Sequence, residues 1–208
     1  DYNRDNTSWW CGIELQQNYE TNNRIMNSLV SPEISIPDNG LPVFLSFAES
    51  YYTESEWDFC QVDITTDGGL TWNHLRGSAE EETAPSGTSE GWIQSSHNIG
   101  MYVGETVQIR FYFDTLDEEM NTYPGWLVDD VMIYHKEWLM PEYYSGIVPA
   151  GRSVSFNMIF DAINLLEGDY FATINVSGDN YRFEHDVPVT MHVIGIPELQ
   201  APEYLEYL

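Results

Sequence analysis

The sequence predicts an all-β protein made of two tandem β-sandwiches. Turn-forming residues recur about every ten residues along the chain. No long stretch shows the apolar period of about 3.6 residues that is typical of a helix, and several segments alternate apolar and polar side chains as half-buried strands do. The chain has 208 residues, and a change in composition after Lys136 favours two domains over one.

The first domain is predicted to span residues 1–137. Its strands are expected at 43–52, 57–66, 71–76, 92–98, 106–114 and 126–134. Residues 77–91 are rich in small and acidic residues and are expected to form an exposed loop. Asp67, Gly68 and Gly69 supply the side-chain acceptor and the positive φ angles of a tight hairpin, over which Trp72 is expected to fold back.

The second domain is predicted to span 138–195, with strands at 153–160, 169–177 and 182–193. Val154, Phe156, Met158 and Phe160 alternate with polar residues, which predicts a strand with one buried face. Residues 196–208 contain two prolines and three glutamates. They are expected to form a linker or a docking tail.

The charge is strongly acidic, with 34 Asp and Glu against 7 Lys and Arg. Nucleic acids and anionic membranes bind clustered basic residues, so neither is an expected partner. No apolar run reaches the roughly 18 residues that span a bilayer, so membrane insertion is not expected. Most of the acids are expected to face water, and the remainder could supply oxygen ligands for Ca²⁺.

Four acids are placed by strand alternation where they could face the core. Glu49 shares a face with apolar residues of the strand at 43–52, and Asp58 does so in the next strand. Asp129 and Asp130 are adjacent and point opposite ways, so one of them faces inward. A buried unpaired carboxylate is costly, and a bound cation would compensate it. The alternative is that these acids lie at strand ends in water or accept backbone hydrogen bonds.

The cysteines and the glycosylation sequons bear on localisation. Cys11 and Cys60 either form a disulfide, which suits an oxidising compartment, or are two buried thiols that pack as small apolar side chains. Asn6 and Asn175 satisfy the N-glycosylation sequon. We expect a secreted or cell-surface protein.

No enzyme is predicted from the motifs. The five histidines are scattered, and neither an HExxH motif, a GxSxG elbow nor a glycine-rich phosphate loop occurs. A pair of carboxylates for glycoside hydrolysis stays open, although nothing singles one out. Several tryptophans recur at strand ends, where they either close the core or form a platform for a sugar: Trp57, Trp72, Trp92 and Trp126.

The order of several motifs between residues 8 and 137 resembles a known family. The motifs are WWCG at 9–12, NSLVSP at 27–32, residues 51–58, the hairpin at 67–69, YVG at 102–104, VQIRF at 107–111 and GWLVDDV at 125–131. Together they resemble the MAM-like jelly-roll domain found beside immune-inhibitor-A-type metallopeptidases and in bacterial choice-of-anchor and cleaved-adhesin surface proteins.

The resemblance implies a calcium-stabilised jelly roll that assists adhesion or substrate binding and has no catalysis of its own. The acids of the family fall on Glu54, Asp58, Asp129 and Asp130, whereas alternation selects Glu49 rather than Glu54. That choice stays open here. The zinc-binding motif of the larger peptidases is absent, so no protease activity is implied.

The second domain is similar to the immunoglobulin-like repeats of bacterial secreted peptidases and surface proteins, on the motifs SGIVPAG at 145–151, LEGDY at 166–170 and VPVT at 187–190. Such repeats act as spacers. The expected function is a non-catalytic extracellular module that binds a glycan or protein ligand. The alternatives are a structural subunit that self-assembles through termini or edge strands, and accessory domains of a secreted peptidase.

Overall fold

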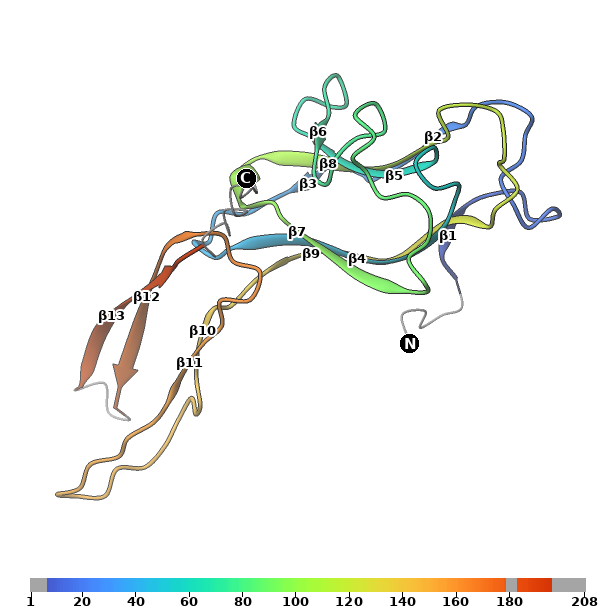
Figure 1. Ribbon diagram of the computed structural model, residues 1–208. Coiled ribbons are helices and arrows are strands. Elements are labelled where there is room, and N and C mark those ends of the chain that lie inside the picture. Colours follow the sequence, from blue (N-terminus) through green and yellow to red (C-terminus); the bar gives the residue numbers. More distant parts are fainter. Residues whose placement is uncertain (1–6, 179–182, 196–208) are drawn as a thin grey trace, which may run out of the picture. The chain divides into compact units, whose positions relative to one another are not determined.

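A computed structural model describes residues 7–178 and 183–195. The described part is all-β, with 45% of its residues in strands and 2% in helix, and none of the antiparallel sheets within it closes into a barrel. The chain divides into two compact units, Asp1–Lys136 and Glu137–Leu208 (Figure 1). The boundary predicted from the sequence follows residue 137.

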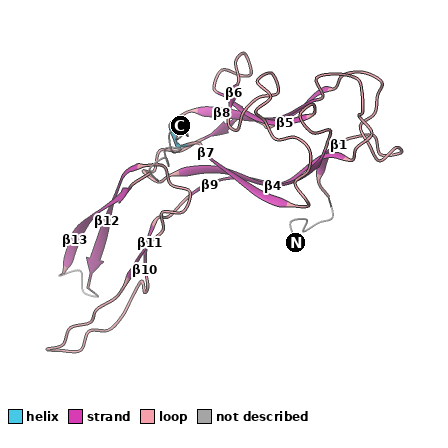
Figure 2. Cartoon of the chain, viewed as in Figure 1, coloured by secondary structure: helices cyan, strands magenta, loops and turns pink. Residues whose placement is uncertain are grey.

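Unit 1 is β-sandwich-like, with two layers of antiparallel strands (Figures 1 and 2). The order of the first sheet is β1 (Trp9–Cys11), β9 (Gly125–His135), β4 (Val43–Tyr52) and β7 (Ile93–Asn98). The second sheet has the order β2 (Met26–Val30), β8 (Thr106–Asp114), β5 (Phe59–Thr65) and β6 (Asn73–His74), and β3 (Ile34–Ser35) also pairs with β8. One short 3₁₀ turn, η1, spans Gly100–Tyr102.

The core of unit 1 lies between these two sheets. Leu45 and Phe47 of β4 are fully buried, as are Val62 and Ile64 of β5, and all belong to one apolar cluster. The Phe47 ring meets the ring of Phe111 from β8 edge to face, with 5.0 Å between the centroids. Burial of each such side chain contributes roughly 1.5–3 kcal/mol, so alternate residues of facing strands stabilise the unit.

The turn between β5 and β6 forms as the sequence predicts. Gly68 and Gly69 have φ angles of 72° and 89°, which favour glycine. The Asp67 carboxylate accepts hydrogen bonds from the Thr71 amide at 3.0 Å and from the Thr71 hydroxyl at 2.6 Å. The Trp72 ring lies over Gly69. The hydrogen bonds that Asp67 accepts also hold its pKa below the ordinary value.

A β-bulge interrupts the pairing of β4 with β9. The register shifts between Ser46 and Ala48, opposite the part of β9 that contains Asp130. Asp130 itself has a φ of 49°, an uncommon value for a residue other than glycine. One extra residue in β9 therefore lets both Val128 and Ile133 pack against the core, although strict alternation would place them on opposite faces.

Unit 2 contains two separate two-stranded sheets among its described residues. β10 (Leu139–Pro141) pairs with β11 (Met158–Phe160), and β12 (Gly168–Ser177) pairs with β13 (Glu184–Val193). Trp138 is buried, and its ring contacts those of Phe160 and Tyr170 at centroid distances of 6.3 and 6.2 Å. The predicted tail at 196–208 lies outside the described residues.

The prediction of a buried face at 153–160 is wrong. Val154, Phe156 and Phe160 are 56%, 47% and 50% exposed. Only residues 158–160 form a strand, and its two-stranded sheet gives these side chains no facing layer within the described part of unit 2. The immunoglobulin-like sandwich expected for this unit stays a prediction.

Candidate functional sites

The acids predicted to bind calcium lie in three places. Glu49 is near the end of β4, Glu54 and Asp58 flank the turn before β5, and Asp129 and Asp130 lie at the bulge of β9. Within residues 7–178 and 183–195, no group of three or more His, Cys, Asp or Glu side chains could hold a metal ion. Any cation site there would need other oxygen donors as well.

Glu49 is buried as alternation predicts, and its charge has a protein partner. The Arg76 guanidinium donates to both carboxylate oxygens, at 2.5 and 3.0 Å. The Ser95 hydroxyl and the indole N–H of Trp126 also donate to it, at 2.5 and 2.9 Å. Since the Arg76 side chain is only 10% exposed, the pair is a buried, fully bonded ion pair that leaves no uncompensated charge for a cation.

Asp58 is in a different situation. It is fully buried; one carboxylate oxygen accepts hydrogen bonds from the Tyr19 hydroxyl and from the Glu54 amide, the latter at 2.9 Å. The other oxygen, Oδ1, is buried with no hydrogen-bond partner. Burial raises the pKa of Asp58 to about 6, and the negative charges of Glu54 and Asp117 add to that rise.

The surroundings of Asp58 are acidic and incompletely bonded. Burial raises the pKa of Glu54 above its ordinary value, and the charges of Asp117 and Glu119 act in the same direction. Asn121 follows in the same loop as these two acids. Its side chain is fully buried, and neither its amide oxygen nor its amide nitrogen has a partner. The surroundings of Asp58 therefore combine a buried carboxylate oxygen without a donor with an excess of negative charge.

Asp129 and Asp130 do not join that corner. Asp129 Oδ1 accepts a hydrogen bond from the Asp130 amide at 2.8 Å, while Asp129 Oδ2 is buried without a partner. The inference that one of the two must face the core assumed strict alternation, and the bulge removes that constraint. Both side chains are partly exposed.

The predicted disulfide is not formed, because Cys11 and Cys60 are both free thiols. Cys11 lies on the edge strand β1 and accepts a weak hydrogen bond from Asn27 at 3.7 Å, whereas Cys60 is fully buried in the core. Burial raises the pKa of both thiols. The alternative, two thiols that pack as small apolar side chains, describes them better.

Of the two predicted glycosylation residues, Asn6 lies outside the described residues. Asn175 is exposed on β12. Its side-chain amide donates to Glu184 at 2.9 Å and to Asp186 at 2.8 Å, both on β13. A glycan at this position would remove at least one of these hydrogen bonds, because the glycosylated nitrogen keeps a single N–H.

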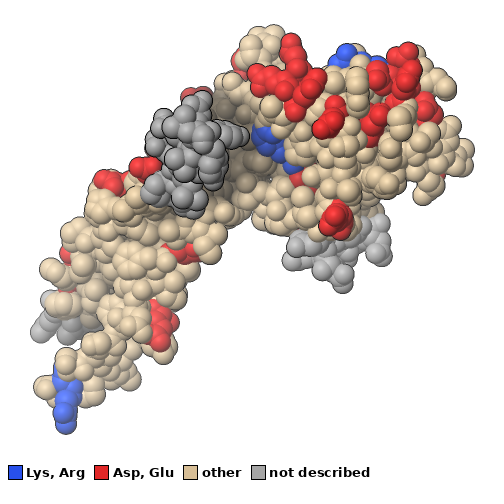
Figure 3. All heavy atoms as spheres, viewed as in Figure 1, with Lys and Arg blue, Asp and Glu red and all other residues tan. Residues whose placement is uncertain are grey.

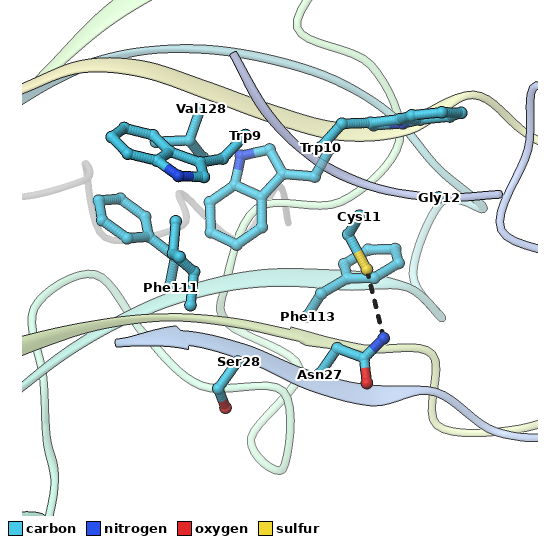
Figure 4. Close-up of a pocket in the computed structure, with 11 residues that line it drawn as sticks. Trp9, Trp10, Cys11, Gly12, Asn27, Ser28, Phe111, Phe113 and Val128 are labelled. Carbon is cyan, nitrogen blue, oxygen red and sulfur yellow. Dashed lines mark hydrogen bonds between the residues drawn. The ribbon is translucent and has the colours of Figure 1, made fainter. Parts of the chain in front are cut away.

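An aromatic cavity of about 360 Å³ opens between the edge strands β1 and β2 (Figure 4). Its lining includes Trp9, Phe111, Phe113 and Trp126, and Asn27 of β2 contributes a polar group. Figure 4 shows the Trp9 and Phe111 rings toward one end of the cavity, with Cys11, Asn27 and Phe113 toward the other. Trp9 is 53% exposed and is available to a ligand at the mouth.

The wall of this cavity is held in place by Trp10 and Gly12. The indole N–H of Trp10 donates to the Pro124 carbonyl at 2.7 Å. A Cβ at Gly12 would lie 2.3 Å from the Trp10 ring, so only glycine fits beneath it. The WWCG motif thus fixes the direction of β1 at the edge of the sheet.

A second, charged cavity of about 590 Å³ lies on the outward face of the sheet that contains β5 and β8. The register places Asp63 opposite Arg110 and Gln61 opposite Tyr112. These residues alternate with the core residues of the same strands, so their side chains leave the core face. The sequence alone does not predict this site, because each strand contains only half of its residues.

Asp63 does not line the charged cavity itself but holds three of its lining residues, Gln61, His74 and Arg110. It is fully buried, and it accepts hydrogen bonds from Arg110 Nε at 2.8 Å, from Gln61 Nε2 at 2.8 Å, and shares one with His74 Nδ1 at 2.8 Å. Asp114, at the end of β8, accepts both Nε and Nη2 of Arg24 at 2.8 Å. The bidentate Arg24–Asp114 pair and the Arg110–Asp63 pair, in which Nε and Nη2 both donate to Oδ2, therefore fix the geometry of the cavity.

Comparison with known proteins does not assign the chain to a family. No family model matches the chain, and no curated protein matches it. In the described part of the chain, no helix is long and apolar enough to span a membrane. Figure 3 shows many Asp and Glu and few Lys and Arg on the visible face of unit 1, in line with a formal net charge of −27.

Proposed function

We propose that the chain is a non-catalytic binding and adhesion module of a bacterial secreted or cell-surface protein, with a MAM-like jelly roll in unit 1 and an immunoglobulin-like spacer in unit 2. The aromatic cavity is the observation that carries the binding function. Its ligand is a glycan or a protein at the cell surface. The order of the sequence motifs and the two-layer antiparallel architecture of unit 1 support the jelly roll.

The aromatic cavity suits a ligand because its rings are preorganised. Trp126 is buried, and its indole N–H is bonded to Glu49, so the floor of the cavity is rigid. Trp9 offers an exposed ring at the mouth, and Asn27 offers hydrogen bonds. Small-molecule sites typically measure about 300–1,000 Å³ and combine apolar walls with a few polar groups. A sugar ring or one large apolar side chain meets these requirements.

Trp9→Ala tests this proposal, with Trp57→Ala as the matched control. Trp57 is 49% exposed, close to the exposure of Trp9, and does not line the cavity. Glycans and surface-protein peptides are titrated while tryptophan fluorescence is recorded. We expect Trp9→Ala to weaken binding about tenfold or more, and Trp57→Ala to leave it within about twofold. Equal effects of the two variants, or no binding by the unmodified chain, would contradict the proposal.

The proposal includes a calcium ion bound at Asp58. The unpartnered Asp58 Oδ1 supports it, because a cation there would stabilise the ionised carboxylate that burial disfavours. Glu54 and Asp117 would add negative charge nearby, and the remaining ligands would come from carbonyl or amide oxygens and water. Glu49 has a complete set of donors and is not included. Chelation is expected to lower the melting temperature of the wild-type protein.

Unit 2 supports a second candidate, a self-assembling structural subunit. Ile147, Phe156 and Phe171 are 88%, 47% and 69% exposed. Among the described residues, β12 and β13 pair only with each other. The outer edge of each strand could therefore accept a further strand. Light scattering decides between the candidates, since monomers with and without chelator would exclude the filament. Accessory domains of a secreted peptidase would share the binding predictions above.

A further inference from the structure

We infer that the charged cavity binds an acidic sugar, whose carboxylate is recognised by Arg24 and Arg110. The inference rests on the proposed binding function, but it uses a site on the outward face of the sheet, separate from the aromatic cavity. The two sites share no lining residue.

The cavity offers free guanidinium donors. Arg24 and Arg110 each direct Nε and Nη2 at an aspartate, and their Nη1 atoms have no partner among the described residues. His74 Nδ1 contacts Asp63 at 2.8 Å, so His74 holds the carboxylate of Asp63 and is not counted among the free donors. These side chains are not sealed off, because 42% of Arg24, 19% of Arg110 and 43% of His74 is exposed. A ligand that accepts hydrogen bonds fits such a site.

The donors are held in fixed positions before any ligand arrives. Arg110 is paired with the buried Asp63, and its guanidinium lies over the rings of Trp72 and Tyr112 at 4.4 and 4.7 Å. Arg24 is fixed by its bidentate pair with Asp114. Preorganised guanidinium groups lose little entropy on binding and match the geometry of a carboxylate.

The two aspartates do not prevent recognition of an anion. Asp63 is 0% exposed and does not line the cavity, whereas Asp114 lines it but is only 4% exposed, and the oxygens of both already accept hydrogen bonds. A ligand in the cavity meets the outer edges of the guanidinium groups instead. The pairs serve to orient the arginines, as buried carboxylates do when they hold a donor toward a ligand.

The cavity favours an acidic sugar over a neutral sugar. Arg110 covers one face of the Tyr112 ring, so the aromatic surface that a neutral sugar would stack on is reduced. Affinity must then come mainly from hydrogen bonds and charge. Glu80 is exposed on the rim and can accept hydrogen bonds from ring hydroxyls. A uronic or sialic acid supplies both the carboxylate and the hydroxyls, and about 590 Å³ accommodates one or two sugar rings.

The test is calorimetric titration of the full chain with a galacturonic acid trisaccharide and with the corresponding neutral galactose trisaccharide. The acidic sugar is expected to bind about tenfold or more tightly than the neutral one, and added salt is expected to weaken it. Equal affinities would overturn the inference. Displacement of the trisaccharide by an equal concentration of inorganic sulfate would also overturn it, because the site would then recognise any anion.

Arg24→Gln and Arg152→Gln form the matched pair of variants. Both remove one positive charge, but Arg152 is an exposed residue of unit 2 and does not line the cavity. Arg24→Gln is expected to weaken binding of the acidic trisaccharide about tenfold, while Arg152→Gln changes it less than about twofold. Equal losses would assign the effect to net charge and overturn the inference.

Two further variants guard against misfolding and separate the two sites. Arg24→Lys keeps the charge but loses the bidentate geometry, so it is expected to bind more weakly than wild type and more tightly than Arg24→Gln. Wild-type affinity in Arg24→Lys together with Arg24→Gln would overturn the inference. Trp9→Ala is expected to bind the trisaccharide normally. If the chain binds other ligands at the aromatic cavity but not the trisaccharide, only the acidic-sugar site is refuted. If the chain binds no ligand at all, the proposed function is refuted as well.

Discussion

The two units use similar strand patterns with opposite results. In unit 1, Phe47 is fully buried between two sheets, whereas Phe171 of unit 2 is 69% exposed on a two-stranded sheet. The same contrast holds for ion pairs, since Arg76–Glu49 is buried and His192–Asp169 is exposed. Alternating apolar and polar residues favour a strand, but the apolar face is buried only where a second layer packs against it. Isolated two-stranded sheets are marginally stable in water. Unit 1 therefore has the rigidity that a binding site needs.

The largest difference is expected for aromatic truncation. Phe47→Ala leaves a cavity in the core and is expected to lower the free energy of unfolding by about 3–5 kcal/mol. Phe171→Ala removes an exposed ring and is expected to change it by less than about 0.5 kcal/mol. Urea unfolding followed by circular dichroism measures both. Similar losses would mean that unit 2 buries its apolar face in solution.

Breaking the buried ion pair of unit 1 is expected to cost more unfolding free energy than breaking the exposed ion pair of unit 2. Arg76→Met leaves Glu49 buried without its charge partner, which is expected to cost about 3–4 kcal/mol. His192→Gln breaks an exposed pair and is expected to have no measurable effect, because water screens it. Chemical denaturation at neutral pH provides the comparison. A stable Arg76→Met variant would show that Ser95 and Trp126 alone can hold the carboxylate.

Asp58 should make the stability of unit 1 depend on pH. Its pKa is about 6 in the folded chain, above the ordinary value of 3.8, so the folded state binds more protons between these values. The contribution of Asp58 to the free energy of unfolding is therefore fully present below pH 4. It falls by roughly 2–3 kcal/mol as the pH rises through 6. Asp58→Asn is expected to remove this loss. Unfolding measured in chelator from pH 4 to 8, as the difference between wild type and variant, tests it.

Calcium should reverse that loss if it binds at Asp58. At pH 7 the wild type is expected to gain stability with added Ca²⁺, and Asp58→Asn is expected to gain none. Glu54→Gln is expected to reduce the gain, since Glu54 adds charge close by. A wild-type melting temperature that is the same in Ca²⁺ and in chelator would refute calcium binding.

The smallest expected difference concerns two glycines. Gly12→Ala pushes a methyl group against the Trp10 ring and is expected to cost about 1–3 kcal/mol and to disturb the aromatic cavity. Gly146→Ala in unit 2 meets open space and is expected to be neutral. Melting temperatures give the cost, and ligand titration shows whether the cavity is altered. A neutral Gly12→Ala would mean that Trp10 can move without loss.

The sequence predicted the strands that alternate cleanly and missed four of the six strands that have five residues or fewer. The ranges at 43–52 and 106–114 coincide with β4 and β8, because both strands have one apolar face over nine or more residues. β1, β2, β3 and β10 were not predicted, since they have two to five residues each and little burial. Strands of that length are specified by their neighbours rather than by their own pattern.

A site residue could be predicted only where its burial follows from the pattern of a single strand. Alternation placed Glu49 in the core, but its partner Arg76 comes from another part of the chain and could not be identified. Asp130 was misjudged because a bulge is invisible in a list of apolar and polar positions. The charged cavity needs the register of β5 against β8, which aligns Asp63 with Arg110. Cross-strand register is a tertiary property, so these groupings appear only in the fold.

The most direct test of the account is a glycan array probed side by side with the wild-type chain, Trp9→Ala and Arg24→Gln. The account predicts that the wild type binds glycans, that Arg24→Gln selectively loses the acidic ones, and that Trp9→Ala retains the acidic ones while it loses ligands of the aromatic cavity. A wild-type chain that binds nothing, or three identical binding profiles, would contradict it.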